Sequence, residues 1–327
     1  MWRKTLLIFA AFWVSYLGFL ASGGALLSTV LLAVPCGLAL AGLGFSVMHD
    51  GGHGAYSSNP RVNKAMARVL DWLGGSSYIW RQKHNLLHHT YPNIVGADDD
   101  IDLGAMARLA PGQPRLRHHR FQHLYMWPLY GFISVKWHLI DDFRQLAAGR
   151  VGQHPFPRPK RGEAVVFWVG KAAFFTWALV VPILVVGPIA ALVFYFVSQL
   201  LLGVTLAAVF QMAHCVEEAD FLAPSADAPP VRLDWAAHQV ATTVDFAPDN
   251  ALATWYLGGL NFQVVHHLFP KVCHVHYPAL ARIVAETCAE HGITYRCTPT
   301  LRAALRSHYR LLRRLGQPEP APVPVAA

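Results

Sequence analysis

Eight histidines in this sequence stand where their imidazole rings could be brought together to bind metal. They occupy the motifs HDGGH, HNLLHH and QVVHH and one isolated position after an apolar segment: His49, His53, His84, His88, His89, His214, His266 and His267. Residues four apart share one face of a helix, so HDGGH and HNLLHH each predict two rings pointing the same way. A single histidine at a helix end is more often interfacial, but clusters among 18 histidines are hard to attribute to packing. Such sites bind Zn, Cu, Fe or Ni, and ligand type alone does not choose among these metals.

Two long apolar blocks must position these histidines. Residues 5–48 contain no Asp, Glu, Lys or Arg, and residues 164–213 contain only Lys171. As a helix, each block would be roughly twice as long as the ~30 Å hydrocarbon core of a bilayer is thick. Turn signals fall near the middle of each block, at Ser22-Gly23-Gly24 and at Gly187-Pro188. The sequence therefore predicts four membrane spans in two hairpins, at about 5–21, 25–48, 164–186 and 189–213.

The basic residues predict how these spans are oriented. Of the 27 Lys and Arg residues, all but Lys171 lie before residue 5, within 49–163, or from 214 onward. By the positive-inside rule, both termini and the polar segments 49–163 and 214–316 should be cytoplasmic, and so should the histidines that follow the spans. A cleavable signal peptide is the competing interpretation of the N-terminus. It is disfavoured because the apolar run is long and a second span follows at once.

The polar segments predict a helical cap over the cytoplasmic ends of the spans. Helices are expected near residues 61–73, 250–267 and 277–291, and residues 120–146 mix aromatic and basic side chains as a helix in the headgroup region would. The fold class is therefore an all-α integral membrane protein, with four transmembrane helices and a cap that carries the histidines. We expect one domain over 1–316, an irregular stretch to about residue 235, and a disordered Pro/Ala tail at 317–327.

Composition excludes some functions and favours others. The chain is 54% hydrophobic and only 14% charged, whereas about a quarter of an average soluble domain is charged. The formal net charge of +8 is explained by the uneven distribution of basic residues and by contact with anionic lipid, so nucleic-acid binding is not required. Five cysteines without a CxxC pair indicate a reducing compartment without a disulfide framework.

The three motifs, taken in order, resemble the histidine boxes of membrane fatty acid desaturases. A third motif that begins with Gln, as QVVHH does, resembles that of the front-end, linoleoyl-CoA desaturase-like branch of the family. The resemblance covers residues from about 45 to 285. Supporting stretches are RFQHLY from Arg120, FQMAH from Phe210 and HLFPKVCHVHYP from His267. Four spans also match the architecture of that family.

The resemblance implies a di-metal site that holds two iron ions. Carried over by position, the ligands would be His49, His53, His84, His88, His89, His214, His266 and His267. Gln263 stands where many members have a ninth histidine, and we favour a role in orienting a neighbouring ligand over direct ligation. Asn261 and His274 are weaker candidates for the same role. Removing hydrogen from an unactivated methylene requires a redox metal and O2, and zinc has no redox chemistry.

Several other polar residues have two interpretations. Arg81 and Lys83 could hold a phosphate-bearing headgroup or a CoA moiety, or could be ordinary interfacial charges. The acidic run at 98–102 is favoured as a solvated helix-capping loop over a cation or donor site. A further histidine cluster, His118, His119 and His123, lies outside the boxes and is interpreted as interfacial. Lys171 is expected to snorkel toward the cytoplasmic surface.

The resemblance implies a cis double bond introduced into a long acyl chain, carried as acyl-CoA or acyl-lipid. Because the sequence lacks the His-Pro-Gly-Gly haem signature found in many front-end desaturases, we expect a separate electron donor, a ferredoxin or a cytochrome with its reductase. An acyl or alkane hydroxylase, or a sphingolipid desaturase, on the same scaffold is the alternative enzyme. A metal-ion transporter is a remote alternative, because the spans next to His49 and His214 carry no charge.

Overall fold

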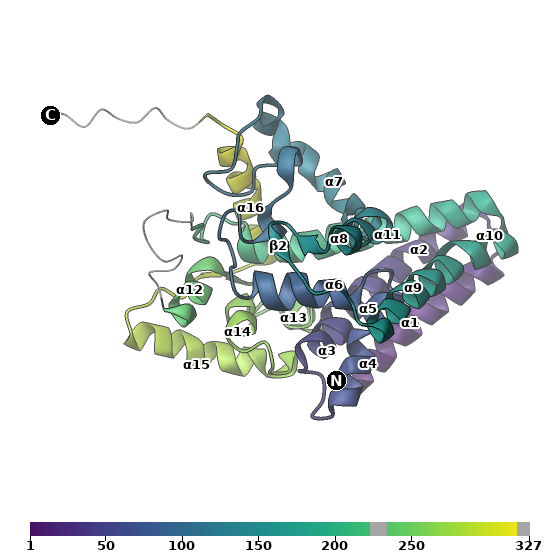
Figure 1. Cartoon of the computed structure of the whole chain (residues 1–327), viewed down its shortest axis with the longest axis horizontal. Helices are drawn as coiled ribbons and strands as arrows, with labels where there is room; N and C mark the ends of the chain where they lie inside the picture. Colours follow the sequence, from purple (N-terminus) through teal and green to yellow (C-terminus); the bar gives the residue numbers. More distant parts are fainter. Residues whose placement is uncertain (223–233, 319–327) are drawn as a thin grey trace.

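The apolar blocks form the long helices of the structure, a computed structural model that describes residues 1–222 and 234–318. In this part of the chain, four helices are long and apolar enough to cross a membrane: Trp2–Ala21, Leu26–His53, Arg161–Val186 and Pro188–His214. The first and last are α1 and α11. The second joins α2 (Leu26–Leu43), η1 (Gly44–Met48) and α3 (His49–His53), and the third joins α9 (Arg161–Phe175), η7 (Thr176–Val180) and α10 (Val181–Val186). They extend together toward one end of the molecule (Figure 1).

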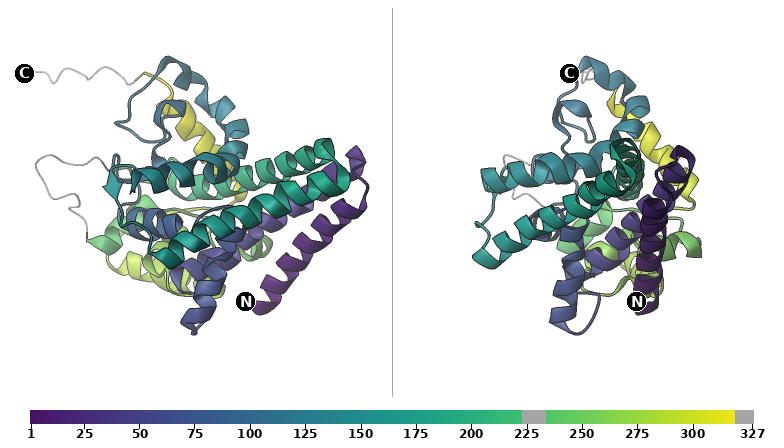
Figure 2. Two further views of the ribbon diagram at one scale, coloured as in Figure 1. Left: turned by 45° about the vertical axis from the view of Figure 1, so that its right-hand side comes forward. Right: turned by 90° about the vertical axis from the view of Figure 1, so that its right-hand side faces the viewer.

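Close helix packing holds these four long helices together. Helix α1 packs along α2, and α11 packs against both α2 and α10. A Cβ on Gly37 of α2 would lie 2.6 Å from the carbonyl oxygen of Ser198 in α11, so only glycine allows the two backbones to approach this closely. Small residues are typical of helix contacts inside membranes for the same reason. Two further views show the long helices side by side (Figure 2).

Shorter helices gather around the histidine-bearing ends of the long ones. Those between the second and third spans are α4 (Pro60–Ala67), α5 (Val69–Trp72), α6 (Ser77–Trp80), η2 (Arg81–His88), η3 (Asp99–Ile101), η4 (Gly104–Met106), η5 (Arg117–Phe121), α7 (Gln122–Lys136), η6 (Trp137–Asp141) and α8 (Asp142–Ala148). Those after the fourth span are α12 (Trp235–Thr242), α13 (Ala251–Tyr256), α14 (Gln263–Leu268), η8 (His274–His276), α15 (Tyr277–Glu290) and α16 (Leu301–Leu315).

Two small sheets of two strands each complete the structure. Strand β1 (Arg150–Val151) pairs antiparallel with β2 (His154–Pro155), and β3 (Asp245–Phe246) pairs in parallel with β4 (Cys297–Thr298). The β3–β4 pair joins the segment before α13 to the segment before α16. The fold is therefore mostly helical, as expected, with local strand pairing that the sequence analysis did not predict.

Two predicted helices are interrupted in the structure. The helix expected at 61–73 breaks at Arg68 into α4 and α5, and the one expected at 250–267 breaks into α13 and α14. The second break has a clear cause, because Gly258 and Gly259 have φ angles of +62° and +70°, which only glycine adopts readily. A Cβ on Gly258 would lie 2.4 Å from the carbonyl oxygen of Phe45, so this turn fits closely against the second span.

Lys171 does not reach toward the membrane surface as predicted. It is 4% exposed, and its Nζ lies 2.6 Å from Oδ2 of Asp142, whose side chain is fully buried. The same nitrogen donates to the carbonyl oxygens of Gly74 and His138. The prediction of snorkelling was wrong because the polar segment between the spans folds back and brings a carboxylate to the lysine.

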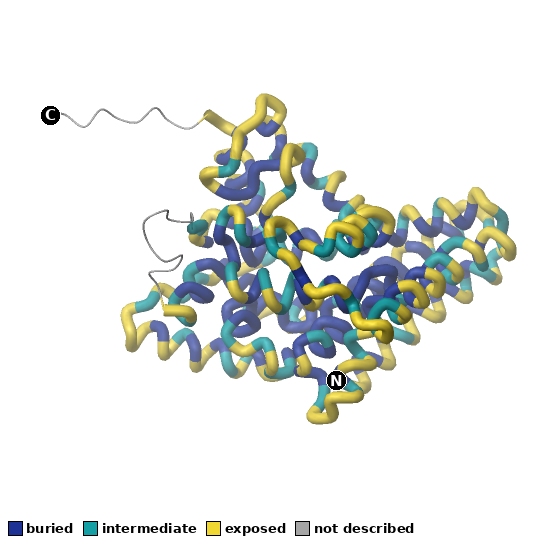
Figure 3. Tube along the Cα trace, viewed as in Figure 1, coloured by how far each residue is buried: buried dark blue, intermediate teal, exposed yellow. Residues whose placement is uncertain are grey.

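The buried residues concentrate where the shorter helices meet the long ones (Figure 3). The largest buried cluster combines side chains of α1, α2, α11 and α13, including Phe12, Leu40, Phe194 and Ala253. Helix α15 confirms the helix predicted at 277–291. Helix α16 was not predicted. Two predictions fall partly outside the described residues. The irregular stretch predicted before residue 235 includes residues 223–233, and the disordered tail predicted at 317–327 includes residues 319–327.

Candidate metal centre

All eight predicted histidines meet at the ends of the spans. One ligand atom from each member lies within 4.8 Å of the others in three groups that share members: His49, His53, His84 and His266; His88, His214 and His267; and His89, His266 and His267. The rings of His89 and His267 are stacked with centroids 4.4 Å apart. Because the groups overlap, they form one continuous cluster with two centres of convergence.

The HDGGH motif is shaped by its two glycines. His49 and His53 lie four apart across α3, and their ring centroids are 4.8 Å apart. A Cβ on Gly51 would lie 2.5 Å from the backbone nitrogen of Ala67, and one on Gly52 would lie 2.3 Å from the ring of Trp80. The glycines therefore let α3 lie directly against α4 and α6, and this contact fixes the direction of both imidazoles.

The HNLLHH motif is wound differently from the helix that the sequence predicts. Residues 81–88 form a π-helix, in which residues five apart come together instead of residues four apart. The Nε2 atoms of His84 and His89 accordingly lie 3.3 Å apart. The ring of His88 is stacked on that of His84, with centroids 5.3 Å apart, and it also groups with His214 and His267. The π winding thus divides one motif between two centres, and π segments of this kind are frequent at functional sites.

The remaining histidines come from the end of α11 and from α14. His214 is the last residue of α11, and His266 and His267 are adjacent in α14, so their rings point to different centres. Gln263 begins α14, and its Nε2 lies 3.0 Å from Nε2 of His214. Helix α14 is held at its start by Asp245, whose Oδ1 accepts a hydrogen bond from the Val264 backbone.

Three neighbouring side chains contact Nδ1 atoms of the clustered histidines at hydrogen-bond distance. The Nδ1 of His88 donates to Asp98 at 3.2 Å and 3.3 Å, and the Nδ1 of His267 donates to Oε1 of Gln239 at 2.8 Å. The Nδ1 of His266 lies 3.2 Å from the hydroxyl of Tyr277. Such contacts fix the tautomer and orientation of a metal-binding histidine.

The inward-facing nitrogens are left without partners. Atoms of this kind, buried and without a hydrogen bond within the described residues, are Nε2 of His53, His88, His266 and His267. A buried polar atom without a partner is costly, and four of them in one cluster of histidines require compensation. A metal ion would supply that compensation to each, so the residues present fit metal ions.

Burial also keeps most of these rings in the form that binds metal. The pKa values of four ring systems fall well below the ordinary value, first because of burial and then because of the neighbouring histidines: His84, His89, His266 and His267. Burial acts on His88 in the same direction, but Asp98 and Asp100 raise its pKa. Neutral imidazole offers a lone pair to a metal, so the cluster is prepared for binding.

Asp98 is the main residue at the histidine cluster that sequence reasoning misjudged. It does cap η3, accepting from the backbone of Asp100, but it is 1% exposed and bonds His88, so it is not a solvated loop residue. Gln239 and Tyr277 were missed entirely. Asp98 could have been suspected from an acidic run close to a histidine motif, whereas a glutamine 28 residues before its histidine carries no sequence signal.

The weaker candidates have other neighbours. Asn261 bonds Thr254 and the Ala247 carbonyl, in the turn between α13 and α14. His274 is bonded by Nδ1 to Asp50 and by Nε2 to Lys4, each at 2.9 Å, so it touches the neighbour of His49 instead of a ligand.

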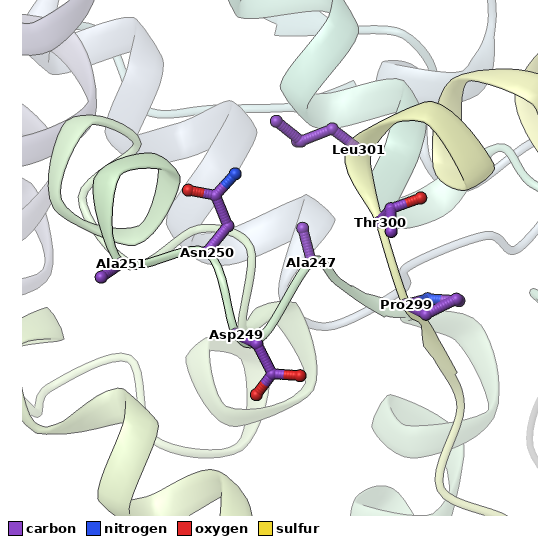
Figure 4. A pocket seen from close by; sticks show the side chains of 7 residues that line it. All are labelled: Ala247, Asp249, Asn250, Ala251, Pro299, Thr300 and Leu301. Carbon is purple, nitrogen blue, oxygen red and sulfur yellow. The ribbon is translucent and has the colours of Figure 1, made fainter.

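The basic candidates are paired with acids. Lys83 lies between Asp99 and Asp100, and Arg81 pairs with Glu163 at the surface. Headgroup binding by these two residues stays a prediction. His118 and His119 both bond the Ala105 carbonyl, far along the chain from the clustered histidines. A surface pocket between the starts of α13 and α16 is lined by seven residues (Figure 4), none of them a clustered histidine.

Four candidate membrane spans and a buried cluster of imidazoles with two centres define a membrane protein with a candidate di-metal site. The comparison with known proteins gives its family. The fatty acid desaturase profile matches residues 25–299, and the chain belongs to that family.

Curated relatives agree with this assignment. The sn-1 linoleoyl-lipid 6-desaturase of Synechocystis sp. is 37% identical over 300 residues, which is 89% of this chain and 80% of the relative. The protein of the same name from Arthrospira platensis is 38% identical over 319 residues, 97% of this chain and 86% of the relative. The acyl-lipid (8-3)-desaturase of Physcomitrium patens is 38% identical over 321 residues, 97% of this chain and 66% of the relative. The chain is therefore an oxidoreductase that desaturates fatty acids.

Proposed function

We propose that this desaturase holds two iron ions in its histidine cluster and uses O2 to introduce a cis double bond into a lipid-linked acyl chain. The observation that carries the metal assignment is the set of buried imidazole nitrogens without hydrogen-bond partners. The names of the relatives, which describe linoleoyl-lipid and acyl-lipid desaturases, favour an acyl-lipid over an acyl-CoA substrate and a desaturase over a hydroxylase or a sphingolipid desaturase.

The two centres would differ in their ligands. His49, His53, His84 and His266 would hold one metal, and His88, His214 and His267 would hold the other, with His89 between them. The second centre has one fewer histidine, and Gln263 lies beside it. We infer that Gln263 orients His214. Iron is favoured over zinc because removing hydrogen from an unactivated methylene requires a redox metal.

The reaction balance defines what the metals and the protein each supply. One CH2–CH2 unit, O2, two electrons and two protons give one CH=CH unit and two molecules of water. Bound iron would supply the redox chemistry for the two C–H bonds. The protein holds the ligands through Asp98, Gln239 and Tyr277. It also keeps the cluster buried, which excludes water from the reacting carbons.

The position of the double bond depends on how the acyl chain is placed beside the cluster. An enzyme gains much of its rate by holding the reacting atoms in one geometry. The histidines lie at the ends of the candidate spans, so an acyl chain would approach from the bilayer while its headgroup stays at the surface. Arg81, which is exposed beside Glu163, is our candidate for the headgroup contact.

The orientation of the protein follows from its charge distribution. With 26 of the 27 Lys and Arg residues outside the long apolar blocks, we propose that both termini and the histidine cluster are cytoplasmic and that the spans form two hairpins. A compartment-sensitive reporter fused after Gly316 tests this topology. Periplasmic or luminal activity of the reporter would contradict it.

Expression in a host that has a compatible electron donor tests the function. Fatty acids are profiled by mass spectrometry separately in the lipid and acyl-CoA pools, and iron is measured in the purified protein. We expect a new double bond to appear first in the lipid pool, with about two irons per chain. His88→Ala should abolish the product. His118→Ala is the matched control and should leave it, because His118 is exposed and, within the described residues, its side chain bonds the carbonyl of Ala105 in η4 and not a clustered histidine.

Two results would contradict the proposal. Hydroxylated fatty acids without double bonds would favour the hydroxylase alternative. Full activity of the His88→Ala variant would show that this histidine is not a ligand. Product appearing first in the acyl-CoA pool would leave the desaturase assignment intact and correct only the carrier.

A further inference from the structure

Helix α16 carries a row of exposed arginines and packs against α11, whose last residue is His214. Five arginines of this helix are exposed: Arg302, Arg306, Arg310, Arg313 and Arg314. The neighbouring η5, which contacts the end of α16, adds Arg117 and Arg120, both exposed. We call these seven residues the arginine face. It lies on the opposite side of the molecule from α4 (Figure 1).

The charges of this face are largely uncompensated within the described residues. Arg314 lies 3.9 Å from Glu217, and no other salt bridge from the arginine face is found in the described part of the chain. Arg302, Arg306, Arg310 and Arg314 follow one another at intervals of four residues, an arrangement in which like charges destabilise a helix. Repulsion between these arginines lowers the stability of the helix, and an acidic partner bound there would relieve the repulsion.

The buried side of α16 reaches the backbone next to a proposed ligand. The Nδ1 of His308 donates to the carbonyl oxygen of Cys215 at 2.7 Å, and Cys215 directly follows His214. Ser307 accepts a hydrogen bond from the backbone of Glu217 at 2.8 Å. Since a helix with its side chains is about 10–12 Å across, the arginine face is roughly one helix diameter from the chain that carries His214.

A membrane surface fits this face less well than a protein does. A helix that lies on a membrane inserts an exposed apolar side, but the apolar side chains of α16, such as Leu311 and Leu312, are buried against the rest of the protein. No large apolar side chain is exposed anywhere in α16. Helix α16 therefore offers charge to the outside, and Phe121 is the exposed large apolar side chain of the neighbouring η5.

We propose that the arginine face is the docking site for an acidic one-electron carrier protein, which delivers electrons through α16 to the metal centre. This inference rests on the proposed function, in which two electrons per double bond come from outside the chain. Transient redox complexes use small interfaces and opposite charge to meet quickly. Electron tunnelling becomes slower with distance, so a face close to a ligand-bearing segment is the appropriate place for such a carrier.

The experiment uses the iron-loaded enzyme in phosphatidylcholine nanodiscs with reduced plant-type [2Fe–2S] ferredoxin as the acidic carrier. The variant Arg306→Glu/Arg310→Glu reverses two charges of the face. The matched control Arg61→Glu/Lys64→Glu makes the same change in net charge on exposed residues of α4. We expect the KM for ferredoxin to rise about tenfold or more in the first variant and to stay unchanged in the control.

Further measurements distinguish carrier docking from a loss of folding, of iron or of intrinsic activity. Added salt should raise the KM of the wild type but affect the reversed variant little, since salt screens exposed charges. Arg306→Lys/Arg310→Lys should keep the wild-type KM. Single turnover after chemical reduction with dithionite bypasses the carrier and should be equal in all variants, with equal iron content. Failure of the wild type in this single turnover would overturn the proposed function itself.

Two outcomes would overturn the docking proposal alone. One is an unchanged KM for ferredoxin in the reversed variant, or an equal change in the α4 control. The other is a face that binds anionic headgroups instead. In that case phosphatidylserine in the nanodiscs would raise the melting temperature of the wild type but not of the reversed variant, with the KM for ferredoxin unaffected.

Discussion

Asp98 offers the sharpest test of how the histidines are prepared for metal. This residue is 1% exposed, and its two oxygens accept from Nδ1 of His88 and from the backbones of Asn93 and Asp100, the last two at 3.0 Å. Every contact of the carboxylate is therefore with a donor. Asp98→Asn keeps the shape of the side chain and replaces one acceptor by an NH2 group, which must then face a backbone N–H or His88.

The substitution should act on the tautomer of His88. An amide NH2 facing Nδ1 favours the tautomer that carries its proton on Nε2, and that nitrogen can then no longer bind a metal. Losing one hydrogen bond to a charged group costs about 1.5–3 kcal/mol. As each 1.4 kcal/mol is about a factor of ten, we expect roughly a 10- to 100-fold loss of metal affinity or activity, the usual range for such supporting residues.

Iron content and double-bond yield are measured together for this variant. Asp102→Asn is the matched control, because Asp102 belongs to the same acidic run but is exposed and, in the part of the chain that the structure describes, accepts from the backbone of Gly104 and not from a histidine. The control should retain both iron and activity. If Asp98→Asn also keeps full iron content and full yield, the tautomer of His88 is not set by Asp98 and the reasoning is refuted.

Three further substitutions follow from the contacts described above. Gln263→Ala should lower metal affinity or activity about 10- to 100-fold if Gln263 orients His214, whereas a total loss of both would argue for direct ligation. Lys171→Met should destabilise the protein by about 3–5 kcal/mol by leaving Asp142 buried and unpaired, seen as a lower melting temperature. Burial raises the pKa of Asp142 to about 6 even with Lys171 lowering it, so removing Lys171 should raise this pKa further. The deficit should therefore shrink as the pH falls toward 6 and Asp142 of the variant becomes protonated, and a deficit independent of pH would contradict the assignment. Gly52→Ala should reduce both iron content and folded yield, because its Cβ would lie 2.3 Å from the ring of Trp80, and wild-type values for both would show that α3 can move away from α6 at no cost.

The sequence was sufficient to find the eight histidines because each motif is local. HDGGH forms the predicted pair across α3, and the apolar blocks form four long helices. HNLLHH also forms the predicted pair, because the rings of His84 and His88 are stacked, but its π winding and the contact of His84 with His89 were not predicted. Nothing in the local pattern distinguishes a helical turn of this kind from an ordinary one, since the choice depends on packing around it.

The supporting contacts were the least predictable part of the site. Gln239 and His267 are 28 residues apart, and Lys171 and Asp142 are 29 apart. Such pairs are decided by how separate segments fold together, and the polar residues themselves look like ordinary surface residues in the sequence. Helix α16 was missed although Thr300 provides an N-cap and its arginines recur at helical spacing. That pattern could have been recognised in the sequence, whereas the contact of the helix with Cys215 could not.

The wide sequence span of the histidine cluster sets the order of events during biosynthesis. The first clustered histidine is residue 49 and the last is residue 267, so no centre is complete until most of the chain has left the ribosome. His274 adds a similar constraint, because it bonds Lys4 across 270 positions of sequence. A complete metal centre therefore cannot form until residue 267 has been synthesised and its segment has folded against the long helices.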